Sequence, residues 1–124
     1  MPKPSERQSK FLEARGISVP PTKAAASTLI GYIKNGNFAG KAQTEADRIA
    51  ALRSAQNNYM GKNVRHRLHG WAGVVKYILA KNAEQMGLCR DVGEDLSNKS
   101  PFRAYVDWGE NGTSQTTLGN VELL

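Results

Sequence analysis

The chain has 124 residues, which is enough for one domain or for two very small ones. Hydrophobic residues make up 40% and charged residues 23%, so the composition is that of a globular protein and argues against general disorder. No apolar run approaches the roughly 18 residues of a membrane span, and the N-terminus MPKPSERQSK lacks the apolar stretch of a signal peptide. The single cysteine, Cys89, excludes an internal disulfide. We therefore expect a cytoplasmic protein with no membrane contact.

The net charge of +6 is unevenly distributed along the chain. Residues 1–90 carry 15 lysines and arginines against 5 acidic residues, whereas residues 91–124 carry 2 against 6. Lysine and arginine displace the counterions that condense on phosphate, so a cation-rich segment of this length favours a polyanionic partner.

Residues 1–37 predict two short helices joined by an extended linker. Ser5 followed three residues later by Gln8 is a capping box, and the helix that it starts should end at Gly16. Two prolines at positions 20 and 21 then enforce an extended path, after which Thr22 can cap a second helix. That helix carries one apolar stripe and has Gly36 past its end; the stripe consists of Ala26, Leu29, Ile30 and Ile33.

This first segment resembles the helix-extension-helix modules related to SAP and LEM domains. The resemblance rests on Arg15-Gly16-Ile17 at the end of a short helix, on the extended linker, and on Thr22-Lys23 at the start of the next helix. It implies that Lys23 and the backbone amides after Thr22 face DNA phosphate, a position where a helix N-terminus attracts anions in any case. The alternative is a helical hairpin that serves only for docking.

Residues 38–60 predict a linking helix that Thr44 caps, with Asp47 three residues on. Its apolar face is narrow, so it should rest on one neighbour; Ile49, Leu52, Gln56 and Tyr59 form that face. The preceding GNFAGK is no phosphate-binding loop, because Gly36 and Gly40 are one residue too close and Ala42 stands where a hydroxyl must reach Mg²⁺.

Residues 61–124 show period-two alternation and turn signals instead. Strands are predicted over 64–69, 73–79 and 102–108, and Asn111-Gly112 predicts a hairpin into TSQTTL and a terminal GNVELL. Short strands without a long helix between them indicate a small antiparallel barrel. The insertion at about 79–100 is too long for a tight turn, so a short helix over 81–86 that ends at Gly87 is expected within it.

This second segment resembles the SH3-like, Tudor-type barrels appended to DNA helicases and transcription-repair factors. The residues that fall on the family pattern of glycines, valines and histidine are Gly61, Val64, His66, Gly70, Gly73 and Val75. The resemblance implies an adaptor without chemistry of its own, which binds a protein of the transcription or repair machinery or else nucleic acid.

The stretch VRHRLHGW within this segment, residues 64–71, admits several interpretations. On a strand, His66 and His69 would face opposite sides, so a shared metal ion is not expected, and nothing around Cys89 indicates an activated thiolate. Val64, His66 and Leu68 should share one face and Arg65 and Arg67 the other. Trp71 either stacks on a base or fills a partner's pocket, or it folds back over the open end of the barrel.

The sequence thus predicts an α+β protein, with an N-terminal helical hairpin, a linking helix and a C-terminal small antiparallel SH3-like β-barrel. We expect a non-enzymatic, DNA-associated protein that contacts phosphate and makes few contacts with base edges. DNA is preferred to RNA as the partner, and no cofactor or metal is expected. The alternative is an adaptor or inhibitor, of the kind that phages and plasmids encode, that acts on a host protein such as a transcription or repair factor. The residues predicted to bind nucleic acid are Arg7, Lys10, Arg15, Thr22, Lys23, Lys62, Arg65, Arg67, Trp71 and Lys76.

Overall fold

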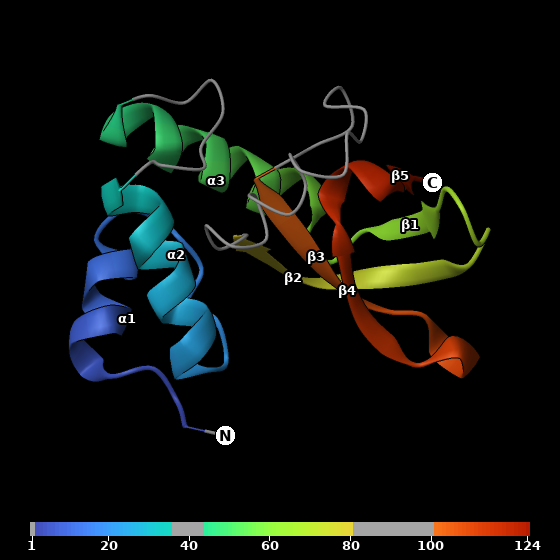
Figure 1. Cartoon of the computed structure of the whole chain (residues 1–124), viewed down its shortest axis with the longest axis horizontal. Helices are drawn as coiled ribbons and strands as arrows, with labels where there is room; N and C mark the ends of the chain where they lie inside the picture. Colours follow the sequence, from blue (N-terminus) through green and yellow to red (C-terminus); the bar gives the residue numbers. More distant parts are fainter. Residues whose placement is uncertain (1, 36–43, 81–100) are drawn as a thin grey trace, which may run out of the picture.

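The computed structural model of the chain describes residues 2–35, 44–80 and 101–124. Its architecture is α+β: three helices, α1 (Glu6–Glu13), α2 (Lys23–Asn35) and α3 (Glu45–Tyr59), precede a five-stranded antiparallel sheet. The strands are β1 (Asn63–His66), β2 (Ala72–Ala80), β3 (Phe102–Asp107), β4 (Thr113–Thr117) and β5 (Val121–Leu123). Figure 1 shows α1 and α2 side by side at one end of the molecule, the β1–β2 hairpin at the other, and α3 running between them. The predicted helix over 81–86 lies outside the described residues, as do Gly36, Gly40, Ala42 and Cys89.

The helices begin where the sequence predicts, because their caps are local. The Ser5 hydroxyl accepts from the Gln8 backbone amide and the Gln8 side chain accepts in return from the Ser5 amide, so the capping box is complete. Thr44 accepts from the Asp47 amide at 3.1 Å in the same manner. The first helix gives way to Gly16, whose φ of +72° is a left-handed conformation that glycine adopts without strain.

The linker between α1 and α2 ties the helices to the sheet through the backbone of Ser18. Its amide donates to Oε1 of Gln56 at 2.8 Å, and its carbonyl accepts from the Gln56 side-chain amide and from the Tyr77 hydroxyl. Gln56 belongs to α3 and Tyr77 to β2, so one linker residue joins these two elements. The helical and sheet parts accordingly share one continuous core.

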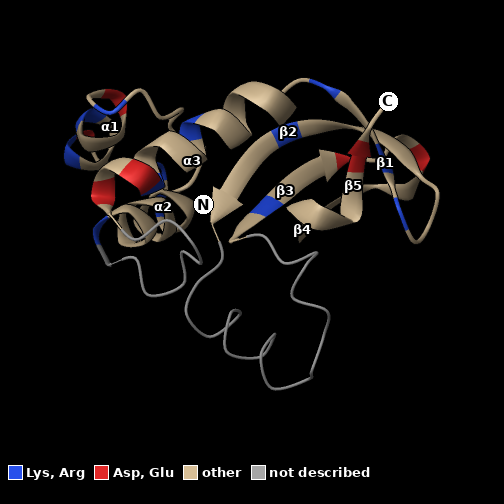
Figure 2. Cartoon of the chain, turned by 90° about the horizontal axis from the view of Figure 1, so that it is seen from above, with Lys and Arg blue, Asp and Glu red and all other residues tan. Residues whose placement is uncertain are grey.

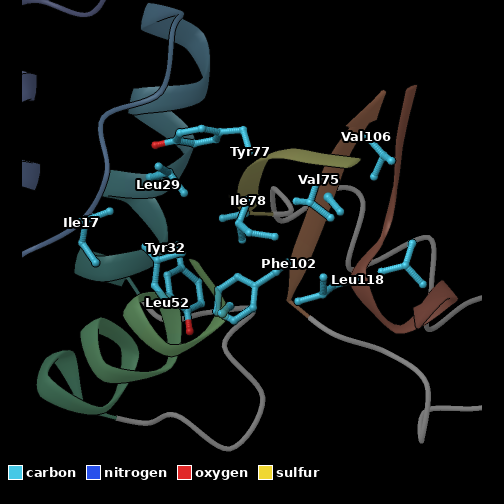
Figure 3. Packing of buried hydrophobic residues seen from close by; sticks show 14 of the residues in the cluster. Ile17, Leu29, Tyr32, Leu52, Val75, Tyr77, Ile78, Phe102, Val106 and Leu118 are labelled. Atoms are coloured by element: carbon cyan, nitrogen blue, oxygen red, sulfur yellow. The ribbon is translucent and has the colours of Figure 1, made fainter. Parts of the chain in front are cut away.

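That core lies where α2 and α3 meet the sheet. The Tyr32 ring on α2 packs edge-on against Phe102 on β3, with the ring centroids 5.2 Å apart. Figure 3 shows Leu52 of α3 close to this pair, and Tyr77 beside Leu29 of α2. Burial raises the pKa of the Tyr32 hydroxyl to about 12, so the group is neutral at any physiological pH.

The sheet has the strand order β4-β3-β2-β1-β5, in which β5 returns to pair with β1. Within the described residues the sheet is not closed into a barrel. It does curl, because Nε2 of His66 on β1 lies 3.4 Å from Oγ1 of Thr116 on β4, although two strands separate them in the sheet order.

The alternation predicted for 102–108 is confirmed, and the one predicted for 64–69 holds only in part. Phe102, Ala104, Val106 and Trp108 are buried, while the residues between them are exposed or half-buried. Val64 and His66 are also buried, but β1 ends at His66 and the chain turns, which leaves Leu68 78% exposed. The prediction that Leu68 shares the buried face was therefore wrong.

A bulge in β2 was not predicted. Val75 pairs with Val106 and Tyr77 with Tyr105, so Lys76 has no partner residue on β3. The extra residue puts Val75 and Ile78 on the concave face and turns Tyr77 toward the helices, where its hydroxyl reaches Ser18.

None of the helices in the described residues is both long and apolar enough to cross a membrane.

Candidate nucleic-acid interface

The turn between β1 and β2 is organised by His66. Nδ1 of its ring accepts from the backbone amides of Leu68 and His69, at 3.1 and 3.2 Å. The His66 amide donates to the Trp71 carbonyl and the Gly70 amide donates to the His66 carbonyl, both at 2.8 Å. Four hydrogen bonds on one residue hold the turn of residues 67–70 in a single conformation.

These contacts require the neutral form of the His66 ring. Because Nδ1 accepts two hydrogen bonds, the proton of the neutral ring is on Nε2, which faces the Thr116 hydroxyl. Desolvation by burial, followed by the charge of neighbouring His69, lowers the pKa of His66 below its ordinary value of 6.5. The acceptor state is thus the stable one at neutral pH.

Four aromatic rings gather around this turn. The His69 ring stacks on Trp71, with centroids 4.5 Å apart and planes 23° apart. Trp71 meets Trp108 at 6.2 Å in an edge-on arrangement, and His66 meets Trp108 in the same way at 5.6 Å. Trp108 is buried and donates from its indole to Ser114 at 3.0 Å. Trp71 is half-buried against this group.

The prediction that His66 and His69 face opposite sides was wrong, because His69 lies in the turn and not on the strand. Their ring centroids are 4.5 Å apart. The described residues nevertheless contain no group of three metal-ligating side chains, and Nδ1 of His66 is already occupied by two amides.

Exposed cations lie along the whole hairpin, two near its turn and two at the opposite end. Arg65 and Lys76 project from β1 and β2, and Lys62 and Arg67 lie immediately before and after β1; all four are exposed. None of them forms an ion pair with another described residue. Arg65 lies opposite Glu122 in the pairing of β1 with β5, so part of its charge is offset. Arg67 follows β1 and has no acidic residue opposite it in this pairing.

The predicted cations of the helical part are arranged differently. Lys10 forms an ion pair with Glu6 at 2.9 Å, and Arg7 lies in a surface depression with these two residues. The Arg15 guanidinium lies 3.5 Å from the centre of the Phe11 ring, donates to the Phe11 carbonyl and approaches Glu45 at 3.7 Å. Arg15 therefore joins α1 to the start of α3, a role that its sequence context did not reveal.

The start of α2 is also partly occupied. Thr22 caps the helix, its hydroxyl accepting from the Ala25 amide at 3.2 Å. The Lys23 amide donates to the Pro2 carbonyl at 2.9 Å. Two of the orphan amides that the resemblance directs at phosphate thus have partners inside the chain, while the Lys23 side chain is exposed.

The predicted cations consequently fall into two groups. Figure 2 shows basic residues on all three helices and on β1, β2 and β3, with acidic residues on α1, α3 and β5. The first group, Lys62, Arg65, Arg67 and Lys76, lies along the hairpin, and Trp71 lies at its turn. The group on α1 and at the start of α2 lies at the opposite end of the molecule (Figure 1).

Two exposed side chains of the turn, Leu68 and His69, were not among the predicted site residues. The signal that could have found them is Gly70, whose φ of +71° marks a tight turn directly after RLH. No protein-family model, no curated protein and no solved structure matches this chain.

Proposed function

We propose that the chain is a non-enzymatic nucleic-acid-binding protein that contacts phosphate through the β1–β2 hairpin, with DNA as the expected partner. The observation that carries the proposal is the set of exposed cations along the hairpin: Arg65 and Arg67 lie beside the turn that His66 organises, and Lys62 and Lys76 lie at the opposite end. Cations without intramolecular partners cost little to transfer to phosphate, and a preformed turn loses little entropy on binding.

We propose in addition that the sheet is of the SH3-like barrel type. The four-stranded meander with β5 returned to β1, and the approach of His66 to Thr116 across the concave face, support this assignment. The helical part then serves mainly as a support that packs on β2, since its start of α2 and its Arg15 are engaged inside the chain.

Fluorescence anisotropy of labelled DNA at two salt concentrations tests the proposal. The affinity should fall as salt rises, and replacement of Lys62, Arg65 and Arg67 together by alanine should flatten the log-log slope by about two to three units. The matched control removes the same charge from exposed positions outside the proposed surface, Lys3, Lys34 and Arg53. Equal slopes for the two triple variants, or a slope near zero for the wild type, contradict the proposal.

The second candidate is a protein-interaction adaptor or inhibitor. It is favoured by three exposed leucines: Leu68 on the turn at 78%, Leu123 on β5 at 51%, and Leu124 after β5 at 63%. Under this function DNA binding is absent at low salt, and a single stoichiometric protein partner is retained after nuclease treatment and lost on Leu68→Glu.

A further inference from the structure

The turn of residues 67–70 displays an aromatic ring beside a cation. Arg67, Leu68 and His69 are all exposed, and their backbone is fixed by the His66 ring, by the 2.8 Å bond from the Gly70 amide, and by a bond of the same length from the Arg67 amide to the Asn120 carbonyl. The three side chains therefore project from a rigid base.

His69 is placed for the base-stacking role that was one of the alternatives considered for Trp71. Its ring stacks on Trp71 at 4.5 Å and is the more exposed of the two, so it covers one face of the indole. Trp71 rests in turn against buried Trp108 at 6.2 Å. The more exposed ring is accordingly His69, which lies against Trp71 and, at the same centroid distance of 4.5 Å, against His66.

An aromatic ring with adjacent cations suits an unpaired base and not a duplex. In a duplex the faces of the bases are covered by their neighbours, whereas a single strand can place a base face on an aromatic side chain and its phosphates on nearby arginines. We infer that the nucleic acid bound is single-stranded, with an unpaired base stacked on His69 and a flanking phosphate held by Arg67. This inference rests on the proposed function, and it adds His69 as a binding residue.

The test compares three ligands of equal length: an oligothymidylate of about 20 nucleotides, a chain of the same length that is abasic at every position, and a duplex. The variants are His69→Ala, His69→Phe and Arg67→Ala, with Gln115→Ala on the exposed strand β4 as a control outside the turn. Thermal unfolding of each variant verifies that the fold is retained, which is expected because the His69 side chain is exposed.

The single strand should bind more tightly than the duplex. His69→Ala should weaken binding of the oligothymidylate by about tenfold or more, His69→Phe should restore most of it, and neither change should affect the abasic chain. Arg67→Ala should weaken binding of all three ligands and reduce the salt slope on the single strand by about 0.7.

The failures of the two proposals are distinguishable. Duplex binding as tight as single-strand binding, or an equal loss for His69→Ala on the normal and the abasic chain, overturns the stacking role and leaves the phosphate surface standing. Absence of binding to every ligand at low salt overturns the proposed function together with this inference and favours the adaptor.

Discussion

Replacement of His66 by alanine tests whether one side chain holds the β1–β2 turn. The substitution removes the acceptor of the Leu68 and His69 amides, the contact with the Thr116 hydroxyl, and the edge-on packing against Trp108. His66 is only 7% exposed, so these contacts are made in a largely desolvated place.

The magnitude follows from the contacts that are lost. Each amide hydrogen bond to Nδ1 contributes about 1 kcal/mol, since water can reach the freed amides of an exposed turn. The aromatic contact adds about 1 kcal/mol. We expect the free energy of unfolding to fall by about 3 kcal/mol, a large part of the roughly 5–15 kcal/mol that stabilises a domain.

Urea unfolding, followed by circular dichroism, measures this change. Tryptophan fluorescence is unsuitable as the signal, because the substitution itself alters the packing around Trp71 and Trp108. His69→Ala is the matched control: it removes the neighbouring imidazole but no hydrogen bond from a buried group, and should cost about 1 kcal/mol or less. His66→Asn retains a side-chain acceptor and should recover about half of the loss. If His66→Ala is no more destabilising than His69→Ala, the reasoning about the turn is refuted.

Three further outcomes are expected. Because the pKa of His66 is lowered in the folded state, the unfolded chain binds more protons than the folded chain between that pKa and about 6.5. The free energy of unfolding should therefore fall as the pH drops below about 6.5. Urea titrations at several pH values measure this fall, which should be smaller in the His66→Asn variant because its side chain does not titrate. Gly73→Ala would place a Cβ atom 2.5 Å from the Asp107 carbonyl oxygen and should lower the free energy of unfolding by about 3 kcal/mol. Gly70→Ala should lower it by about 1 kcal/mol, because its Cβ meets no atom within 4 Å and only the positive φ is unfavourable. Equal losses for the two variants in thermal unfolding would contradict this expectation. Tyr77→Phe removes the hydroxyl that joins β2 to the α1–α2 linker and should lower the free energy of unfolding by about 1–2 kcal/mol. The affinity for DNA should not change, so a loss of affinity in the anisotropy assay would contradict the hairpin as the binding surface.

The burial of Tyr32 shows what the apolar pattern of a single helix cannot predict. The apolar stripe of α2 was predicted to hold Ala26, Leu29, Ile30 and Ile33, yet Tyr32 is fully buried as well. It is buried because α2 also meets Phe102 on β3, a residue 70 positions away in the chain. Such contacts depend on which elements pack together, and periodicity within one helix does not contain that information.

The sequence by itself determined the α+β fold class, the starts of the helices and the alternation of β3. Caps such as Ser5–Gln8 and Thr44–Asp47 act within four residues, and a half-buried strand needs only its own alternation, so neither depends on distant parts of the chain. The tertiary structure decided the rest. The bulge at Lys76 exists because β2 must pack on β3 and on the helices at once, and His66 became the acceptor of the turn because the chain reverses after it, which brings His69 back beside it.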